Sequence, residues 1–331
     1  MGHKKYRAAQ LADWLFKRGV RSFAEMSNMP AGVRAILEEK FTASSLVMLK
    51  KQVSAQEGTA KYLFELRDGQ AVETVLMKYR HGNSACLSTQ AGCRMGCRLC
   101  ASALGGLVRN LTPGEMYDQV LLVQQDSGER VSHLVLMGTG EPLDNMDNTI
   151  IFLRHVTSEY GLNISFRHIT LSTCGLVPQI RKLAALKLPL TLAVSLHAPE
   201  DTLRSRLLPV NNKYPLGELM EACRYYTGVT GRRITFEYAM LAGLNDSPEQ
   251  AAKLAALVRG ILCHINLIPY NQVAGKDYAP SSDVAVSRFK SLLESLGVAV
   301  TVRRKMGADI DAACGQLRRA MTKGPTGGGR C

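Results

Sequence analysis

The chain has 331 residues, and its 41 Lys+Arg against 28 Asp+Glu give a formal net charge of +13. Hydrophobic residues make up 46%, enough for a packed core and too many for a disordered chain. No run of 18 apolar residues lacks charges and Met1–Tyr6 is not apolar, so we expect a cytoplasmic protein without a membrane partner. The positive charge favours a polyanionic partner such as nucleic acid, although a basic protein without one has the same composition.

Residues 1–45 are expected to form a helical accessory domain, since Leu11, Trp14 and Leu15 fall near helical spacing. The basic residues between them could bind RNA phosphates or simply face solvent. In the region 46–84, apolar and polar residues alternate over 62–66 and 72–77 on either side of Asp68-Gly69, which predicts a β-hairpin.

Short β-rich segments alternate with helical ones over 85–305, which predicts an α/β fold with a parallel sheet. Thr112-Pro113-Gly114-Glu115 is a capping box, and Ser247-Pro248-Glu249-Gln250 repeats the pattern. The alternation fits either an open doubly wound sheet or a full or partial barrel, with ligands at the carboxyl ends of the strands. We expect strands near 85–89, 134–137, 169–172, 192–196, 234–238, 265–268 and 298–302.

Three cysteines follow the first of these strands, in Cys93-Arg-Met-Gly-Cys97-Arg-Leu-Cys100. In a reducing compartment such thiols are expected to bind metal or do chemistry, not to form a disulfide framework. Thiolates are ligands for iron–sulfur clusters and for zinc. A closed zinc site needs a fourth ligand, which the neighbouring sequence lacks, whereas three ligands leave one iron of a four-iron cluster open.

The Cys-x3-Cys-x2-Cys loop resembles that of the radical S-adenosylmethionine (SAM) enzymes. Leu134–Pro142 contains Gly138-Thr-Gly140-Glu141-Pro142, which is similar to the Gly-Glu-Pro motif of that family. The resemblance implies a radical SAM partial (β/α)6-type barrel. It also implies a [4Fe–4S] cluster on Cys93, Cys97 and Cys100, with SAM as co-substrate on the open iron. We interpret the glycines as allowing close approach of this ligand, with Glu141 accepting from its ammonium group.

Within that family, the chain resembles the RlmN/Cfr RNA adenine methyltransferases over nearly its whole length. The matching segments include Cys86–Cys93, Gly307–Leu317 around Cys314, Ser195–His197, Leu203–Pro209 and Leu267–Asn271. The resemblance assigns residues 306–331 to a loop with a catalytic cysteine and a basic flexible tail. It also implies SAM contacts from Gly140, Glu141, Ser172, Ser195, Leu196, His197 and Asn271.

The resemblance implies a route through a methylated cysteine, with two SAM per turnover. Cys314 accepts a methyl group from one SAM, and the radical from a second SAM activates that group for addition to adenine. Glu73 takes the proton from the base, and Cys86 releases the product through a transient disulfide with Cys314. By strand pattern alone, Glu73 could instead be a solvent-facing residue of the hairpin.

The implied substrates are an adenosine of 23S rRNA near the peptidyl-transferase centre and the adenosine 3′ of the anticodon in some tRNAs. A flavodoxin- or ferredoxin-type electron donor and a monomeric state are also expected.

Methylation at C8 instead of C2, as in the antibiotic-resistance branch, is an alternative that the motifs do not separate. Outside the enzyme class, the alternative is a zinc-containing RNA-binding module. Cys174, Cys223 and Cys263 are interpreted as core or near-core thiols, and Cys331 as a tail residue.

Overall fold

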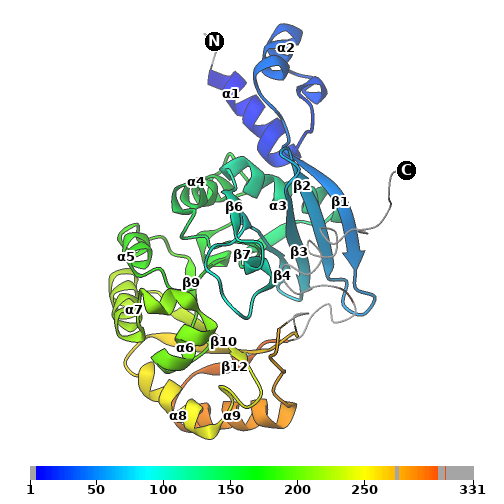
Figure 1. Ribbon diagram of the computed structural model, residues 1–331. Helices are drawn as coiled ribbons and strands as arrows, with labels where there is room; N and C mark the ends of the chain where they lie inside the picture. The colour runs from blue at the N-terminus through cyan, green and yellow to red at the C-terminus, as the bar shows by residue number, and fades with distance from the viewer. Residues whose placement is uncertain (1–4, 273–275, 305–309, 311–331) are drawn as a thin grey trace, which may run out of the picture.

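The computed structural model describes residues 5–272, 276–304 and 310. The first part is a small helical unit with its own core, formed by Val20, Phe23, Met26, Met29, Val33 and Leu37. Tyr117 donates a hydrogen bond to the carbonyl of Phe16 (3.0 Å), and Gln125 donates to that of Gly19 (2.6 Å), so the unit docks on helix α3 (Pro113–Ser127). Figure 1 shows this unit projecting beyond one end of the sheet. Its segments are α1 (Lys5–Ala12), a π-helical turn (Asp13–Arg18), a 3-10 turn (Phe23–Glu25) and α2 (Ala31–Lys40).

Three antiparallel strands follow: β1 (Leu46–Val53), β2 (Ala60–Leu66) and β3 (Ala71–Tyr79). The expected hairpin is confirmed, because β2 and β3 flank Asp68-Gly69 and Gly69 has a φ of 77°. β3 then pairs antiparallel with β4 (Gly82–Cys86), so these strands continue directly into the main sheet.

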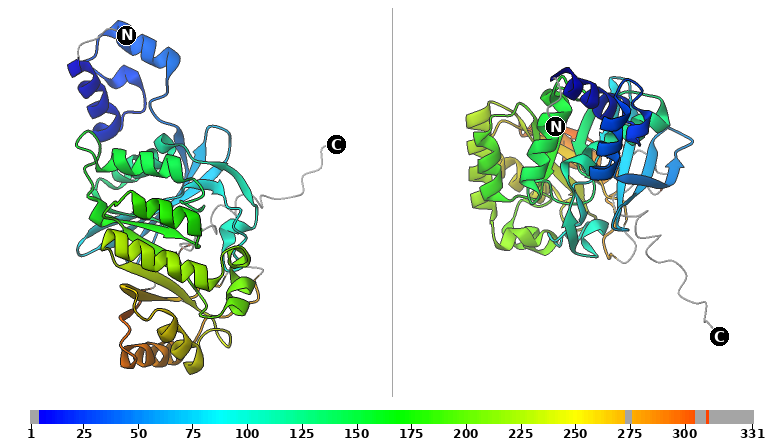
Figure 2. Two further views of the ribbon diagram at one scale, coloured as in Figure 1. Left: turned by 90° about the vertical axis from the view of Figure 1, so that its left-hand side faces the viewer. Right: turned by 90° about the horizontal axis from the view of Figure 1, so that it is seen from above.

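The main sheet has ten strands in the order β1-β2-β3-β4-β7-β8-β9-β10-β11-β12. From β4 onward the neighbouring strands are parallel, and helices between them cover one face of the sheet, as Figure 2 shows. A separate hairpin, β5 (Gln90–Gly92) with β6 (Leu107–Asn110), frames the cysteine loop. This arrangement confirms the α/β class and the parallel sheet expected from the sequence. The remaining strands are β7 (Val131–Leu136), β8 (Ile169–Thr173), β9 (Thr191–Ser195), β10 (Ile234–Met240), β11 (Cys263–Pro269) and β12 (Val300–Val302).

Two helices, α3 and α8, begin at the start signals found in the sequence. Thr112 and Glu115 form the expected capping box at the start of α3. At α8, Ser247 accepts from the amide of Gln250, but the Gln250 side chain donates to Glu200 (2.8 Å) instead of completing the box. The second hydrogen bond of the capping box is therefore replaced by a contact between α8 and Glu200. The other helices are α4 (Met146–Thr157), α5 (Val177–Ala185), α6 (Asp201–Leu207), α7 (Leu216–Thr230), α8 (Pro248–Leu257) and α9 (Asp283–Ser295). Short 3-10 turns occupy Ala101–Ala103, Phe166–His168 and Pro209–Asn212.

The two faces of the sheet differ in chemistry. Side chains such as Leu134, Leu136 and Leu171 point to the helices and belong to the main core. The alternate residues point to the other, inner face, where Cys86 packs with Val75 and Met77. Polar groups gather on this inner face because it borders the site described below. No helix in the described part of the chain is long and apolar enough to cross a membrane.

Candidate active site

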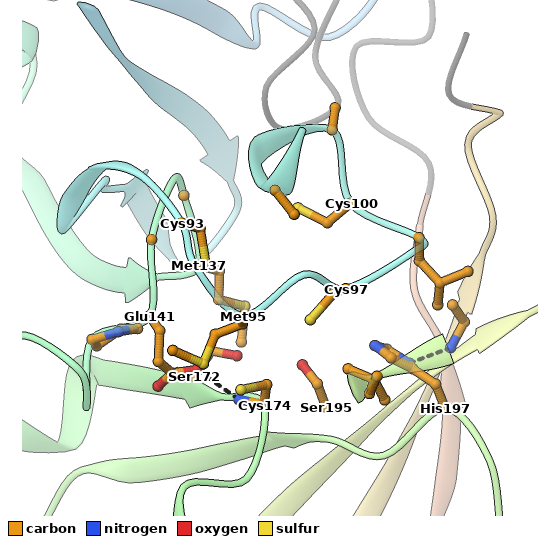
Figure 3. A pocket seen from close by; sticks show the side chains of 18 of the residues that line it. Cys93, Met95, Cys97, Cys100, Met137, Glu141, Ser172, Cys174, Ser195 and His197 are labelled. Carbon is orange, nitrogen blue, oxygen red and sulfur yellow. Dashed lines mark hydrogen bonds between the residues drawn. The ribbon is translucent and has the colours of Figure 1, made fainter. Parts of the chain in front are cut away.

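A cavity of about 290 Å³ opens at the carboxyl ends of the parallel strands (Figure 3). Its walls come from the cysteine loop and from the ends of β7, β8, β9, β10 and β11, where ligands of parallel α/β sheets bind. The residues expected from the sequence that line it are Cys93, Cys97, Cys100, Gly140, Glu141, Ser172, Ser195, His197 and Asn271. Nine expected positions, separated by up to 178 residues in sequence, therefore meet at one cavity.

The cysteine loop is anchored by backbone hydrogen bonds at its start and near Cys97. The amide of Cys93 donates to Gly106 O (2.8 Å), and the amide of Arg98 donates to Leu207 O (2.8 Å). Within the loop, the amide of Cys100 donates to Cys97 O (3.2 Å). Three thiols are thus presented to one cavity from an anchored loop.

The donor set fits an iron–sulfur cluster better than one metal ion. Thiols are the preferred cluster ligands, and three of them line the cavity. Among the residues that the structure describes, no three Cys, His, Asp or Glu side chains converge tightly enough to hold a single ion. Burial raises the pKa of the Cys93 thiol to about 12, so a metal must displace this proton as it binds.

The turn after β7 is joined to the segment that leads to the cysteine loop. Gly138 N donates to Leu87 O (3.0 Å), and Glu141 N donates to the side chain of Gln90 (2.8 Å). A Cβ on Gly138 would lie 2.6 Å from Leu87 O, and Gly140 has a φ of 112°. Close contacts with Leu87 and Gln90 of the chain itself therefore require these glycines, and their role in admitting a ligand stays a prediction.

Glu141 is a buried carboxylate aimed along the cavity wall. Its oxygens accept from the amide of Leu143 (3.1 Å) and from that of Cys174 (2.8 Å). Burial raises the pKa of Glu141, and these amide hydrogen bonds oppose that shift. The side chain is thereby fixed in place as an acceptor for a cationic group.

His197 has its conformation and its tautomer set by neighbours. Its φ is 58°, and its Nδ1 accepts from the amide of Ala239 (3.0 Å). Burial lowers the pKa of this imidazole to about 3, so the ring is neutral and carries its proton on Nε2. His197 therefore offers one N–H donor at the cavity. Leu196 differs from the other expected residues, because its fully buried side chain belongs to the core and does not line the cavity.

Glu73 lies on the inner face of β3 and is not solvent-facing. Its carboxyl group is 4% exposed and forms an ion pair with the fully buried Lys61 ammonium at 3.0 Å. Val75, two residues along the same face, is opposite Cys86 on β4. Cys86 in turn packs against Met137, which lines the cavity. The structure therefore brings Glu73 and Cys86 to neighbouring positions beside the cavity, whereas Cys314 and Cys331 lie outside the described residues.

Cys174 is a buried thiol of the main core, as expected, and it also lines the cavity. Its thiol hydrogen-bonds with Cys97, and this bond lowers the pKa of Cys97. Its position, two residues after Ser172 at the end of β8, is the sequence signal that could have identified it. Cys223 is fully buried in the main core, as expected. Met95, Met137 and Tyr270 also line the cavity; each lies within a motif named above, but none was expected to be a site residue.

A parallel α/β sheet whose carboxyl edge carries a three-cysteine loop and a Gly-x-Gly-Glu turn defines a radical SAM enzyme. Residues 87–255 match the radical SAM superfamily, and residues 1–43 match the ribosomal RNA large subunit methyltransferase N-terminal domain. The chain belongs to the RlmN family of radical SAM RNA methyltransferases, whose cofactors are a [4Fe–4S] cluster and SAM.

Two relatives and one solved structure illustrate this membership. The chain is 59% identical over 96% of its length to a probable dual-specificity RNA methyltransferase RlmN of Desulforamulus reducens, of which 91% is covered. It is 61% identical over 96% of its length to that of Pelotomaculum thermopropionicum, with 87% covered. A radical SAM methyltransferase from Sphaerobacter thermophilus has the same fold, with a TM-score of 0.92 and 43% identity over 95% of this chain and 93% of that one.

Proposed function

We propose that this chain methylates C2 of an adenosine in 23S rRNA and the adenosine 3′ of the anticodon in tRNAs, through an S-methylcysteine at Cys314. The observation that carries the proposal is the meeting of the cysteine loop, Glu141 and the strand-end polar groups at one cavity, with Cys86 and Glu73 beside it. The relatives' name, dual-specificity RNA methyltransferase, supports two RNA substrates. The net charge of +13 suits a phosphate-rich partner.

The cavity residues divide the work of binding. Cys93, Cys97 and Cys100 hold the cluster, and Glu141 accepts from the ammonium group of SAM. Ser172, Ser195, His197 and Asn271 contribute polar side chains, whereas Leu196 packs in the core between Ser195 and His197. When bound, the cluster and SAM supply the methyl group and, from a second SAM, the radical that activates it.

Three residues carry out the protein's part of the chemistry. Cys314 takes up the methyl group as a thiolate and links it to the base. Glu73 removes the proton from the base carbon, and the cluster, when bound, would take up the one electron that radical addition leaves over. The Cys86 thiol then attacks the Cys314 sulfur: a sulfur–sulfur bond forms, the bond from that sulfur to the transferred carbon breaks, and the carbon takes up a proton to become the methyl group of the released RNA. Cellular thiols reduce the disulfide that remains. The donor of electrons to the cluster is a flavodoxin- or ferredoxin-type protein, and the enzyme acts as a monomer in the cytoplasm.

The position of methylation is tested by mass spectrometry of nucleosides. Ribosomal RNA and tRNA from a strain without the endogenous activity are treated with the reconstituted protein, SAM and a reductant. We expect 2-methyladenosine in both RNAs. 8-Methyladenosine alone would assign the chain to the C8 alternative, and product in only one RNA would reject dual specificity. A colourless protein with about one zinc per chain, inactive on both, would favour the zinc-containing RNA-binding module.

A further inference from the structure

Arg204 is a fully buried arginine that the proposed chemistry does not use. It lies in α6, one layer behind the cavity wall. Its guanidinium donates to Cys174 O (2.7 Å), Ser195 O (3.1 Å) and Leu196 O (3.3 Å). These carbonyls end β8 and β9, so one side chain joins the two turns that present Ser172, Ser195 and His197.

In the described part of the chain, no carboxylate is in direct contact with the Arg204 guanidinium. Its remaining bond goes to the side-chain Oδ1 of Asn211 (2.8 Å), and the Asn211 Nδ2 donates to the Asp201 carboxyl (2.9 Å). The Asp201 carboxyl lies beyond Asn211, and the thiols of Cys174, Cys97 and Cys223 also lie near the guanidinium. Burying a guanidinium is costly unless an anion balances it. An anion bound at the cysteine loop would lie on one side of Arg204 and would balance its charge.

The same helix also supports the cysteine loop. Leu207, at the end of α6, accepts the hydrogen bond from the amide of Arg98, between Cys97 and Cys100. A thiolate-bound cluster is anionic, and reduction adds one more negative charge. A fixed positive charge nearby stabilises the reduced form more than the oxidised one.

We propose that Arg204 is a positioning residue that clamps the ends of β8 and β9 for SAM and provides the buried positive charge that favours the reduced cluster. This inference rests on the proposed placement of the cluster at Cys93, Cys97 and Cys100. The two roles depend on different properties of the side chain. The clamp requires the forked guanidinium, whereas the electrostatic role requires only a positive charge.

The test compares Arg204→Met and Arg204→Lys in the full chain, reconstituted without oxygen. Redox titration followed by electron paramagnetic resonance measures the reduction potential, and the change of that signal with added SAM measures affinity. We expect Arg204→Met to lower the ratio of reduced to oxidised cluster at fixed potential three- to tenfold, about 30–60 mV. Arg204→Lys should keep most of the potential. Both variants should bind SAM about tenfold more weakly, because each loses the forked contacts.

Arg181→Met is the matched control, because it removes an arginine from the exposed pair with Glu221 and should alter neither quantity. Iron content and thermal unfolding confirm that the variants are loaded and folded. If Arg204→Met does not fold, Arg204→Lys provides the test. A decrease of about 30–60 mV in the reduction potential of Arg204→Lys, which keeps the positive charge, would reject the electrostatic role. Unchanged SAM affinity in any folded variant rejects the clamp, and an unchanged potential in Arg204→Met rejects the electrostatic role. A wild-type protein without iron would instead overturn the proposed function itself.

Discussion

Replacing Cys86 by alanine is expected to leave the protein covalently attached to RNA. In the proposed chemistry this thiol acts only after the bond between Cys314 and the base has formed, so its loss stops release and not addition. Cys86 is 7% exposed and lies on the inner face beside Met137, with Val75 opposite. Gel mobility and nuclease digestion of the purified variant measure the attached RNA.

The matched control for this experiment is Cys263→Ala, which removes a half-buried thiol at the amino end of β11, away from the cavity. It should turn over normally and carry no RNA. The double variant Cys86→Ala/Cys314→Ala should also carry none, because the attachment needs Cys314. Normal turnover by Cys86→Ala would show that Cys86 does not release the product.

Replacing Lys61 by methionine is expected to destabilise the protein by about 3–5 kcal/mol, because it leaves the buried Glu73 carboxylate without its cation. Both groups of this pair are almost fully buried, at 0% and 4% exposed, and their charged atoms are 3.0 Å apart. Replacing both residues, as Lys61→Met/Glu73→Leu, removes both charges and should restore most of the stability. Urea unfolding of the full chain measures these differences.

The double variant also separates stability from catalysis. It should fold nearly as well as the wild type yet form no methylated adenosine, because no carboxylate remains to take the proton. Lys290→Met, which breaks the exposed pair with Glu294, is the control and should change neither property appreciably. A double variant with normal product formation would remove Glu73 from the chemistry, and a stable Lys61→Met would contradict the energetic argument.

The parts of the fold that sequence predicts are those with local causes. The β/α rhythm follows from short apolar segments and helix caps, and the Thr112–Glu115 box forms as expected. The cysteine loop and the Gly-Glu turn are contiguous motifs, so their place at the ends of β5 and β7 follows from neighbouring residues. Once the strands are parallel, their carboxyl ends must share one edge, which gathers the site.

The features that sequence does not predict depend on contacts across the fold. Strand alternation alone allows Glu73 to face solvent, and only the inner face built by β2, β3 and β4 buries it beside Lys61. In the sequence Arg204 is one of two basic residues of α6 and carries no special signal, because its acceptors lie at the ends of β8 and β9. The same holds for Gly138, since its neighbour is Leu87, 51 residues earlier.

Reductive cleavage of SAM is the property that the proposed chemistry of this protein most directly requires. The chain is purified without oxygen, reconstituted, and given SAM, dithionite and substrate RNA, and iron and 5′-deoxyadenosine are measured together. We predict about four irons per chain and formation of 5′-deoxyadenosine that Cys97→Ala abolishes. Iron-loaded wild-type protein that forms no 5′-deoxyadenosine, even with substrate RNA present, would show that the protein does not carry out radical SAM chemistry.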